Sequence, residues 1–253
     1  MVGVYDSGIG GLSVWKELRA LMPRQDYVYV ADSAHCPYGE KSPEYITGRA
    51  CAVTDFLIGR GAEAVVVACN TATAAAISYL RSHYTVPFVG MEPAVKPAAL
   101  ASRTGVVGVL ATANTFKGSL YHDTVMRYAS DIRIVEKVGR GLVEAVERGE
   151  VPSELVRRYV EEMTEEGADV IVLGCTHFPF LEKEIARVAG PDVRIINPAP
   201  AVARQTARVL RSPEEGGGTA EFYSTGDPSV LMRTAVSIDP ELTAEHFHQI
   251  NIQ

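Results

Sequence analysis

The sequence reads Gly61-Ala-Glu-Ala-Val-Val-Val-Ala-Cys69-Asn-Thr71 and, 106 residues later, Gly167-Ala-Asp-Val-Ile-Val-Leu-Gly-Cys175-Thr-His177. Each copy has a Gly-Ala-acid lead-in, an apolar run typical of a buried strand, and a cysteine followed by polar side chains. A weaker pair, Val2-Gly-Val-Tyr5 and Val107-Gly-Val-Leu110, repeats at an offset of 105 residues. One duplicated half-domain explains both matches. We therefore predict two similar lobes whose cysteines approach one cleft from opposite sides.

The rest of the chain alternates short apolar strands with amphipathic helices, which is typical of a parallel α/β sheet. The predicted strands cover residues 2–5, 28–31, 64–68, 86–90, 106–110, 133–135, 170–173, 194–196 and 220–225. The predicted helices cover residues 12–21, 43–60, 71–83, 115–128, 141–149, 153–166, 180–189 and 201–210, with a last helix after residue 227 and a solvated loop at 211–219. We predict an α/β fold with one lobe of residues 1–92 plus about 205–253, a second lobe of residues 93–204, and an active site between them.

Composition excludes several classes of protein. The chain has 253 residues and a net charge of −7, which argues against nucleic acid or an anionic membrane as the main partner. No apolar run approaches the roughly 18 residues that span a bilayer. Four scattered cysteines do not form a disulfide framework, and the N-terminus lacks the pattern of a secretory signal. We expect a cytoplasmic protein with reduced thiols.

Polar side chains gather where the predicted strands end and helices begin, which is where ligands bind in open α/β sheets. These residues are Asp6, Ser7, Cys69, Asn70, Thr71, Thr112, Thr115, Cys175, Thr176 and His177. Several helix N-termini that converge can hold a carboxylate through their unpaired N–H groups. The alternative for any single hydroxyl or amide in this set is an ordinary helix cap.

Five motifs in sequence carry a family resemblance. They are Asp6-Ser-Gly-Ile-Gly-Gly-Leu12, Ala31-Asp-Ser-Ala-His-Cys-Pro-Tyr-Gly39, Ala68-Cys-Asn-Thr-Ala-Thr-Ala74, Gly174-Cys-Thr-His-Phe-Pro179 and Thr225-Gly-Asp227. Together they resemble the glutamate racemases of the cofactor-independent aspartate/glutamate racemase superfamily. The match runs in order along nearly the whole chain.

The resemblance implies interconversion of L- and D-glutamate, with D-glutamate supplied for peptidoglycan, and no cofactor and no metal. It implies that Cys69 and Cys175 are the catalytic acid/base pair, that Asp6 and His177 assist them, and that Glu147 is a further acidic residue near the pocket. The substrate-binding positions that it implies are Asp6, Ser7, Tyr38, Gly39, Asn70, Thr71, Thr115, Thr176 and His177. It also implies a homodimer.

The chemistry of the pair can be argued from the residues. Two bases on opposite faces of a carbon invert it, because one removes a proton while the other returns one. A helix N-terminus lowers the pKa of a thiol, and we expect both cysteines to lie at the first turn of a helix. His177 is expected to exchange a proton with Cys175, and Asp6 to favour a basic Cys69 thiol.

Other interpretations remain open at this stage. Cys69, Cys175, His177 and Asp6 could surround Zn²⁺ in a hydrolase, although local metal spacing such as Cys-x-x-Cys is absent. The lobes could belong to a two-lobed amino-acid-binding protein, and aspartate racemases share the two-cysteine layout. The remaining glycines and cysteines considered are not assigned a role in proton transfer. Gly8, Gly10 and Gly11 lack the spacing of a dinucleotide loop, and Cys36 and Cys51 are interpreted as structural.

Overall fold

The structure is a computed structural model that describes residues 1–129, 131–210 and 216–252. The described strands form two sheets, and all their pairings are parallel. The first sheet has the order β10-β9-β2-β1-β3-β4 and comprises β1 (Val2–Asp6), β2 (Tyr27–Ala31), β3 (Ala64–Val67), β4 (Phe88–Gly90), β9 (Ala220–Ser224) and β10 (Phe247–Gln249). The second has the order β6-β5-β7-β8 and comprises β5 (Val106–Ala111), β6 (Arg133–Val138), β7 (Val170–Gly174) and β8 (Arg194–Ile196).

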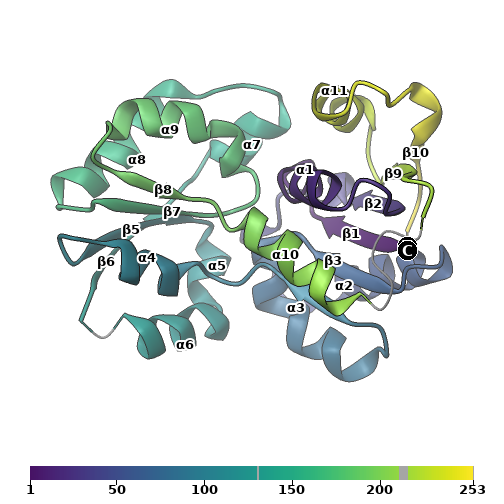
Figure 1. The fold of residues 1–253 in the computed structure, drawn as a ribbon, viewed down its shortest axis with the longest axis horizontal. Helices are drawn as coiled ribbons and strands as arrows, with labels where there is room; N and C mark the ends of the chain where they lie inside the picture. Colours follow the sequence, from purple (N-terminus) through teal and green to yellow (C-terminus); the bar gives the residue numbers. More distant parts are fainter. Residues whose placement is uncertain (130, 211–215, 253) are drawn as a thin grey trace.

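Helices surround both sheets (Figure 1). They are α1 (Leu12–Leu21), α2 (Pro43–Gly59), α3 (Asn70–His83), α4 (Val95–Ala101), α5 (Ala113–Lys117), α6 (Ser119–Tyr128), α7 (Leu142–Glu147), α8 (Ser153–Glu165), α9 (Glu182–Ala189), α10 (Ala199–Val209) and α11 (Ser229–Ile238). Four 3₁₀ turns complete the described structure: η1 (Ser33–His35), η2 (Tyr38–Glu40), η3 (Phe178–Leu181) and η4 (Ala244–His246). None of the helices described is long and apolar enough to cross a membrane.

The predicted two-lobed α/β fold is confirmed. The order β2-β1-β3-β4 in the first sheet is repeated as β6-β5-β7-β8 in the second, so the strands before Cys69 and Cys175 occupy equivalent places. The central strands read as continuous apolar runs because helices cover both faces of a parallel sheet. All residues of β1, β3 and β7 are accordingly buried.

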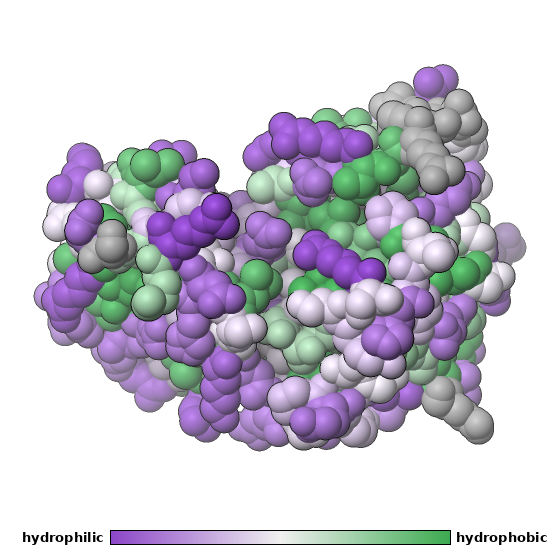
Figure 2. All heavy atoms as spheres, turned by 90° about the horizontal axis from the view of Figure 1, so that it is seen from below, coloured by the Kyte–Doolittle hydropathy of each residue, from purple (hydrophilic) through white to green (hydrophobic). Residues whose placement is uncertain are grey.

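After the second sheet the chain returns to the first through α10. This helix packs against α1, β3 and β4, and it lies between the two lobes in Figure 1. Strands β9 and β10 then add to the edge of the first sheet beside β2. Seen from below in Figure 2, hydrophilic side chains cover the rims of both lobes, and the surface is notched between them.

Some elements differ from the sequence prediction. The helix expected over residues 115–128 is two helices, because Gly118 is extended and lies so close to α3 that a Cβ there would meet Ala74 Cβ at 2.8 Å. Helix α4 and strand β10 were not predicted, since seven and three residues are too short to show a period. Residues 211–215 of the predicted loop 211–219 lie outside the described residues.

Candidate active site

Cys69 lies two residues after the end of β3 and is the N-cap residue of α3. Its backbone is extended, and its Sγ accepts a hydrogen bond from the N–H of Ala72 at 3.4 Å. The side chain of Cys69 therefore occupies the place that a serine or aspartate takes in most N-caps. Only 5% of the residue is exposed. The prediction that a helix begins at this thiol is confirmed.

Cys175 follows β7, and 6% of it is exposed, but it does not begin an α-helix. The chain after it forms the 3₁₀ turn η3, in which the N–H of Phe178 donates to the carbonyl of Cys175 at 3.1 Å. An α-helix would instead need the N–H of residue 179 to donate to that carbonyl, and Pro179 has none. The expectation that both thiols lie at helix N-termini is therefore wrong for Cys175.

Asp6 joins the two cysteine segments. Its Oδ2 accepts a hydrogen bond from the N–H of Gly11 at 2.7 Å, and its Oδ1 accepts one from Thr176 Oγ1 at 3.5 Å. Asp6 also shares a hydrogen bond with Cys69. Burial raises the pKa of Asp6 to about 6, against the lowering effect of His177 and of the Gly11 N–H. One carboxyl group thus contacts Cys69 and the neighbour of Cys175.

The pKa of the Cys69 thiol is raised, as expected from the neighbouring Asp6, and is not lowered as expected from the helix N-terminus. Burial is the largest cause, the carboxylate of Asp6 is the next, and a negative charge on Cys175 adds to both. The hydrogen bonds that Cys69 shares with the N–H of Ala72 and with Ser7 oppose these effects without overcoming them. A thiol with a raised pKa is a strong base once it loses its proton. The influence of Cys175 on Cys69 also means that the two sulfurs interact electrostatically.

His177 connects Cys175 to a carboxylate. Its Nδ1 lies 3.7 Å from Cys175 Sγ, and its Nε2 lies 2.6 Å from Glu147 Oε1. Burial opposes protonation of His177, but hydrogen bonds with Cys175, Cys36 and Glu147 outweigh burial and raise its pKa well above the usual value. Burial likewise acts to raise the pKa of Glu147, and the bond from His177 reverses the direction, so that pKa is lowered. His177 and Glu147 thus form a pair in which the carboxylate of Glu147 balances the charge of the buried His177 imidazolium.

The glycines after β1 allow these side chains to approach the backbone. A Cβ on Gly8 would lie 1.9 Å from Glu147 Oε1, and one on Gly10 would lie 2.4 Å from His177 Nδ1. The N–H of Ile9 donates to Glu147 Oε1 at 2.8 Å. Gly8 and Gly10 therefore have a packing reason in the contact between lobes, which the sequence could not reveal.

Polar groups surround the thiols. Ser7 Oγ lies 3.7 Å from Cys69 Sγ, and a chain of hydroxyls runs from Thr71 through Thr112 to Thr115 with both separations 2.9 Å. Asn70 is buried, and its Oδ1 has no hydrogen-bond partner in the part of the chain that the structure describes. A buried amide oxygen without a partner is costly, so it is suited to accept a hydrogen bond from a ligand.

Tyr38 and Gly39 lie near the site, but they differ in which part of the residue faces it. The hydroxyl of Tyr38 is buried between Tyr5 and Asp32, to which it is hydrogen-bonded, so this side chain is occupied inside the first lobe. Gly39 faces the second lobe, where a Cβ would meet Thr112 Cβ at 3.5 Å. The backbone of this segment, and not the ring, is thus what faces the site.

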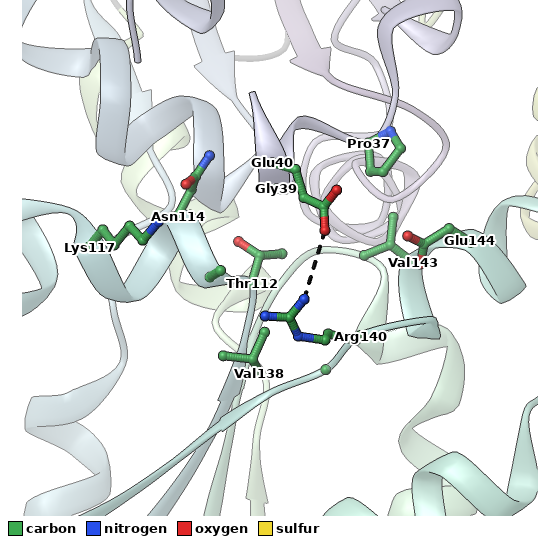
Figure 3. Close-up of a pocket in the computed structure, with 12 residues that line it drawn as sticks. Pro37, Gly39, Glu40, Thr112, Asn114, Lys117, Val138, Arg140, Val143 and Glu144 are labelled. Atoms are coloured by element: carbon green, nitrogen blue, oxygen red, sulfur yellow. Dashed lines mark ion pairs between the residues drawn. The ribbon is translucent and has the colours of Figure 1, made fainter. Parts of the chain in front are cut away.

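A cavity of about 280 Å³ opens between the lobes at this point. Figure 3 shows Glu40 of the first lobe pointing toward Arg140 of the second across it, and Asn114 and Lys117 on one side. Of the predicted site residues in the described chain, only Gly39 lines this cavity. Thr112 also lines it and connects it to the hydroxyl chain. We refer to this cavity as the mouth of the site: it adjoins the hydroxyl chain, whereas Cys69 and Cys175 are not among the residues that line it.

The side chains that could hold a metal are not those considered from the sequence. In the described residues the group with suitable geometry is Cys36, Glu147 and His177, whereas Cys69, Cys175 and Asp6 are not part of such a group. Cys36, interpreted as structural, lies 3.7 Å from Glu147 Oε1. Its place in the loop after β2 gave no sign of this contact, because Glu147 is 111 positions away. Cys51 is a partly buried residue of α2.

Comparison with known proteins agrees with the geometry. The family model described as Asp/Glu/Hydantoin racemase matches residues 13–206. The chain is 47% identical to the glutamate racemase of Herpetosiphon aurantiacus over 237 residues, which cover 90% of this chain and 93% of that protein. It is 48% identical to the glutamate racemase of Methylococcus capsulatus over 248 residues, covering 94% and 92% of the two chains.

Solved structures give the same relationship. Escherichia coli glutamate racemase, solved in complex with L-glutamate, superposes with a TM-score of 0.89 at 32% identity and covers 100% of this chain and 98% of that one. The aspartate racemase of Picrophilus torridus shares only the fold, with a TM-score of 0.57 at 18% identity over 82% of this chain and 92% of its own. From the duplicated sheets, the buried thiols and these matches, the chain belongs to the Asp/Glu/hydantoin racemase family.

Proposed function

We propose that the protein interconverts L- and D-glutamate, with one thiol removing the α-proton while the other returns a proton to the opposite face. The observation that carries this proposal is that Cys69 and Cys175 follow equivalent strands of two duplicated sheets, while Asp6 interacts with Cys69 and accepts a hydrogen bond from Thr176 beside Cys175. Family membership supplies the reaction class, an isomerase acting on amino acids. The 46–48% identity to glutamate racemases supports glutamate as the substrate, whereas the likeness to aspartate racemases extends only to the fold.

In this proposal Asn70 Oδ1 accepts a hydrogen bond from the substrate ammonium, because it is a buried acceptor that the described protein leaves unpaired. The substrate carboxylates are held by hydroxyls and by backbone N–H groups at the carboxyl ends of the strands. The groups that we assign to this binding are Ser7, Thr71, Thr115, Thr176 and the backbone of Tyr38 and Gly39.

Each thiol has its own assistant. Asp6 contacts Cys69 and keeps its thiolate strongly basic, while His177, oriented by Glu147, gives a proton to Cys175 or takes one from it. Forward and reverse reactions use the same groups with thiol and thiolate exchanged. Because both sulfurs are buried, little water competes for the carbanionic intermediate. We assign Glu147 a positioning role, since it acts through His177.

The wider role follows from the substrate. We propose that the protein works in the cytoplasm as a homodimer and supplies D-glutamate for peptidoglycan. Sedimentation equilibrium tests the dimer, and D-glutamate auxotrophy on deletion of the gene tests the cellular role. A fully active monomer would contradict the proposed homodimer and would leave the proposed chemistry unaffected.

The decisive experiment incubates L-glutamate with dialysed enzyme in D₂O containing EDTA, followed by chiral separation and mass analysis. We expect racemisation with one solvent deuterium at the α-carbon and no need for an added cofactor. L-Aspartate in parallel tests substrate choice. Racemisation of aspartate alone would contradict the assignment to glutamate.

The thiols are tested by Cys69→Ala and Cys175→Ala. We expect either variant to lose at least about a thousandfold in kcat, because each lacks one of two required proton carriers. Cys51→Ala removes a thiol outside the site and is the matched control, with unchanged kcat. Circular dichroism checks that the variants are folded, and near-normal turnover in either active-site variant would refute the two-thiol mechanism.

A further inference from the structure

Cys36 is a third thiol at the site, and the proposed mechanism does not use it. It shares a cluster with Glu147 and His177 in which one potential ligand atom from each residue lies within 4.8 Å of the others. We propose that Cys36, Glu147 and His177 form an inhibitory binding site for a thiophilic divalent cation, with Zn²⁺ as its best occupant. The inhibition rests on the proposed function of His177, whereas the binding does not.

The donor set fits this cation. Zn²⁺ binds thiolate, imidazole and carboxylate at about 2.0–2.3 Å, which sets ligand atoms around one ion roughly 3–4 Å apart. Cys36 Sγ lies 3.7 Å from Glu147 Oε1, already in that range. His177 Nε2 lies 2.6 Å from the same oxygen, so this one contact must open for an ion to enter. Three protein ligands leave the fourth position of a tetrahedral ion to water.

Charge also favours occupation. A thiolate at Cys36 and the carboxylate of Glu147 together balance the two positive charges of Zn²⁺, with His177 as a neutral ligand. Binding releases the thiol proton of Cys36 and the proton held between His177 and Glu147 to solvent. The ion has a way in, because Cys36 is partly exposed and the Glu147 side chain is 21% exposed. Pro37, next to Cys36, lines the cavity at the mouth.

The three ligands come from both lobes. Cys36 lies between η1 and η2 in the first lobe, Glu147 ends α7, and His177 precedes η3 in the second. The N–H of Ile9 holds Glu147 from the first lobe, which orients the carboxylate as an outer-shell partner does in metal sites. A bound ion would tie the lobes together. It would also take His177 away from proton exchange with Cys175, and both effects stop turnover.

The binding experiment titrates Co²⁺ into the metal-free enzyme and follows the thiolate-to-metal absorption band, then displaces Co²⁺ with Zn²⁺. The variants are Cys36→Ser and, as the matched control, Cys51→Ser. We expect the band in the wild type and in Cys51→Ser. In Cys36→Ser we expect the affinity for Co²⁺ to fall by at least about tenfold, since even outer-shell changes cost 10–100-fold.

The activity experiment measures glutamate racemisation at buffered Zn²⁺ concentrations. Because a serine hydroxyl can keep the hydrogen bonds of Cys36 with His177 and Glu147, we expect Cys36→Ser to remain active. Relative to its own metal-free rate, it should need at least about tenfold more Zn²⁺ for half inhibition, while Cys51→Ser behaves as the wild type. Equal sensitivity of Cys36→Ser and wild type would place the ion on Cys69 and Cys175 and overturn the proposal. A thiolate band that persists in Cys36→Ser would do the same. Absence of racemisation without metal would instead defeat the proposed function and leave the binding result standing.

Discussion

Asp6 is the residue on which the chemistry of both thiols depends. It is fully buried, it contacts Cys69, and it accepts a hydrogen bond from Thr176 beside Cys175. Burial raises the pKa of Asp6 because the charged carboxylate loses its hydration, and the N–H of Gly11 recovers only part of that loss. The group therefore changes charge within the range in which enzymes are assayed.

The pH dependence of activity should report this group. The pKa of Asp6 is raised to about 6, so the carboxylate is ionised above that pH and protonated below it. Since ionised Asp6 keeps Cys69 basic, we expect kcat/KM to fall by about tenfold per pH unit below pH 6. In Asp6→Asn the fall in kcat/KM near pH 6 should disappear. The variant's turnover should decrease unequally for the conversion of L- to D-glutamate and for the reverse reaction. A wild-type pH profile in Asp6→Asn would contradict the assisting role.

The raised pKa of Asp6 also makes the stability of the folded protein depend on pH. Asp6 binds its proton more tightly in the folded protein than in the unfolded chain. Its contribution to folding stability is therefore most favourable at a pH below its unfolded pKa, near 3.8. That contribution is lost as the pH rises through about 6. The ionised carboxylate that serves catalysis is thus the less stable form of the folded protein.

At the scale of elements, the two copies of the repeat use their acidic lead-in differently. Asp169, before β7, accepts hydrogen bonds from Ser102 Oγ at 2.6 Å, from the N–H of Arg103 at 2.7 Å and from Thr104. Glu63, before β3, is exposed, and among the residues that the structure describes its side chain pairs with the N-terminal ammonium alone, at 3.5 Å. One copy therefore anchors the turn before its strand, and the other does not.

The acidic residues of the two copies, Asp169 and Glu63, should therefore contribute differently to the free energy of unfolding. Burial acts to raise the pKa of Asp169, but the hydrogen bonds from Ser102, Arg103 and Thr104 outweigh it and lower that pKa to about 2. The stabilisation is present above the unfolded pKa of 3.8 and is lost as the pH falls through about 2. We expect Asp169→Ala to reduce the free energy of unfolding by about 2 kcal/mol at pH 7.

Urea unfolding at pH 7 and at low pH measures this effect. Glu63→Ala is the matched control and should change the free energy of unfolding by less than about 0.5 kcal/mol, as is usual for exposed pairs. A loss in Asp169→Ala that is no larger than in Glu63→Ala would contradict the anchoring of this turn.

The turn between β1 and α1 depends on close approach of the lobes. A Cβ on Gly10 would lie 2.4 Å from His177 Nδ1, whereas a Cβ on Gly48 in α2 would meet nothing within 4 Å. We expect Gly10→Ala to displace the His177 ring and to reduce kcat by about a hundredfold or more. Gly48→Ala should keep full activity and stabilise the protein by about 0.5–1 kcal/mol. Steady-state kinetics and urea unfolding of both variants test this contrast, and full activity in Gly10→Ala would refute it.

At the scale of the whole molecule, polar contacts hold the lobes together around the site. Asn114 of the second lobe donates to the carbonyl oxygens of Tyr38 at 3.1 Å and Lys41 at 2.8 Å in the first. Thr71 and Thr112 meet across the same gap. Arg140 and Glu40 also face one another, but at 4.0 Å and with 75% and 83% of their side chains exposed. The hydrogen bonds of Asn114 and Thr112 are shorter than this exposed ion pair, and they hold the lobes in register.

We expect Asn114→Ala to raise KM for glutamate by about tenfold with a smaller effect on kcat, because two hydrogen bonds that close the mouth are lost. Arg140→Ala should change KM by less than about threefold, since an exposed pair at this separation contributes little. Steady-state kinetics in both directions measure the two variants. A larger effect in Arg140→Ala would mean that the exposed pair controls closure.

Much of this protein could be predicted from its sequence because the relevant signals are local. The duplicated runs ending in Cys69 and Cys175 predicted two like sheets, and apolar strands alternating with amphipathic segments predicted their parallel order. The same reasoning missed the break at Gly118 and the 3₁₀ turn after Cys175. Gly118 is shaped by contact with α3, and one proline decides the hydrogen bonding after Cys175. Cys36 was missed because its partners are distant in the chain.

The sequence by itself determined the two-lobed α/β fold and brought the polar residues to the carboxyl ends of the strands, because periodicity and strand order are encoded within short segments. Only the tertiary structure decided how those residues ionise and which of them meet. The pKa of Cys69 depends on burial and on the charge of Asp6, 63 positions away in the sequence. The pKa of His177 depends on burial and on hydrogen bonds with Cys175, Cys36 and Glu147, of which only Cys175 is close to it in the chain. Desolvation and Coulomb interactions act through space, so no local pattern specifies them.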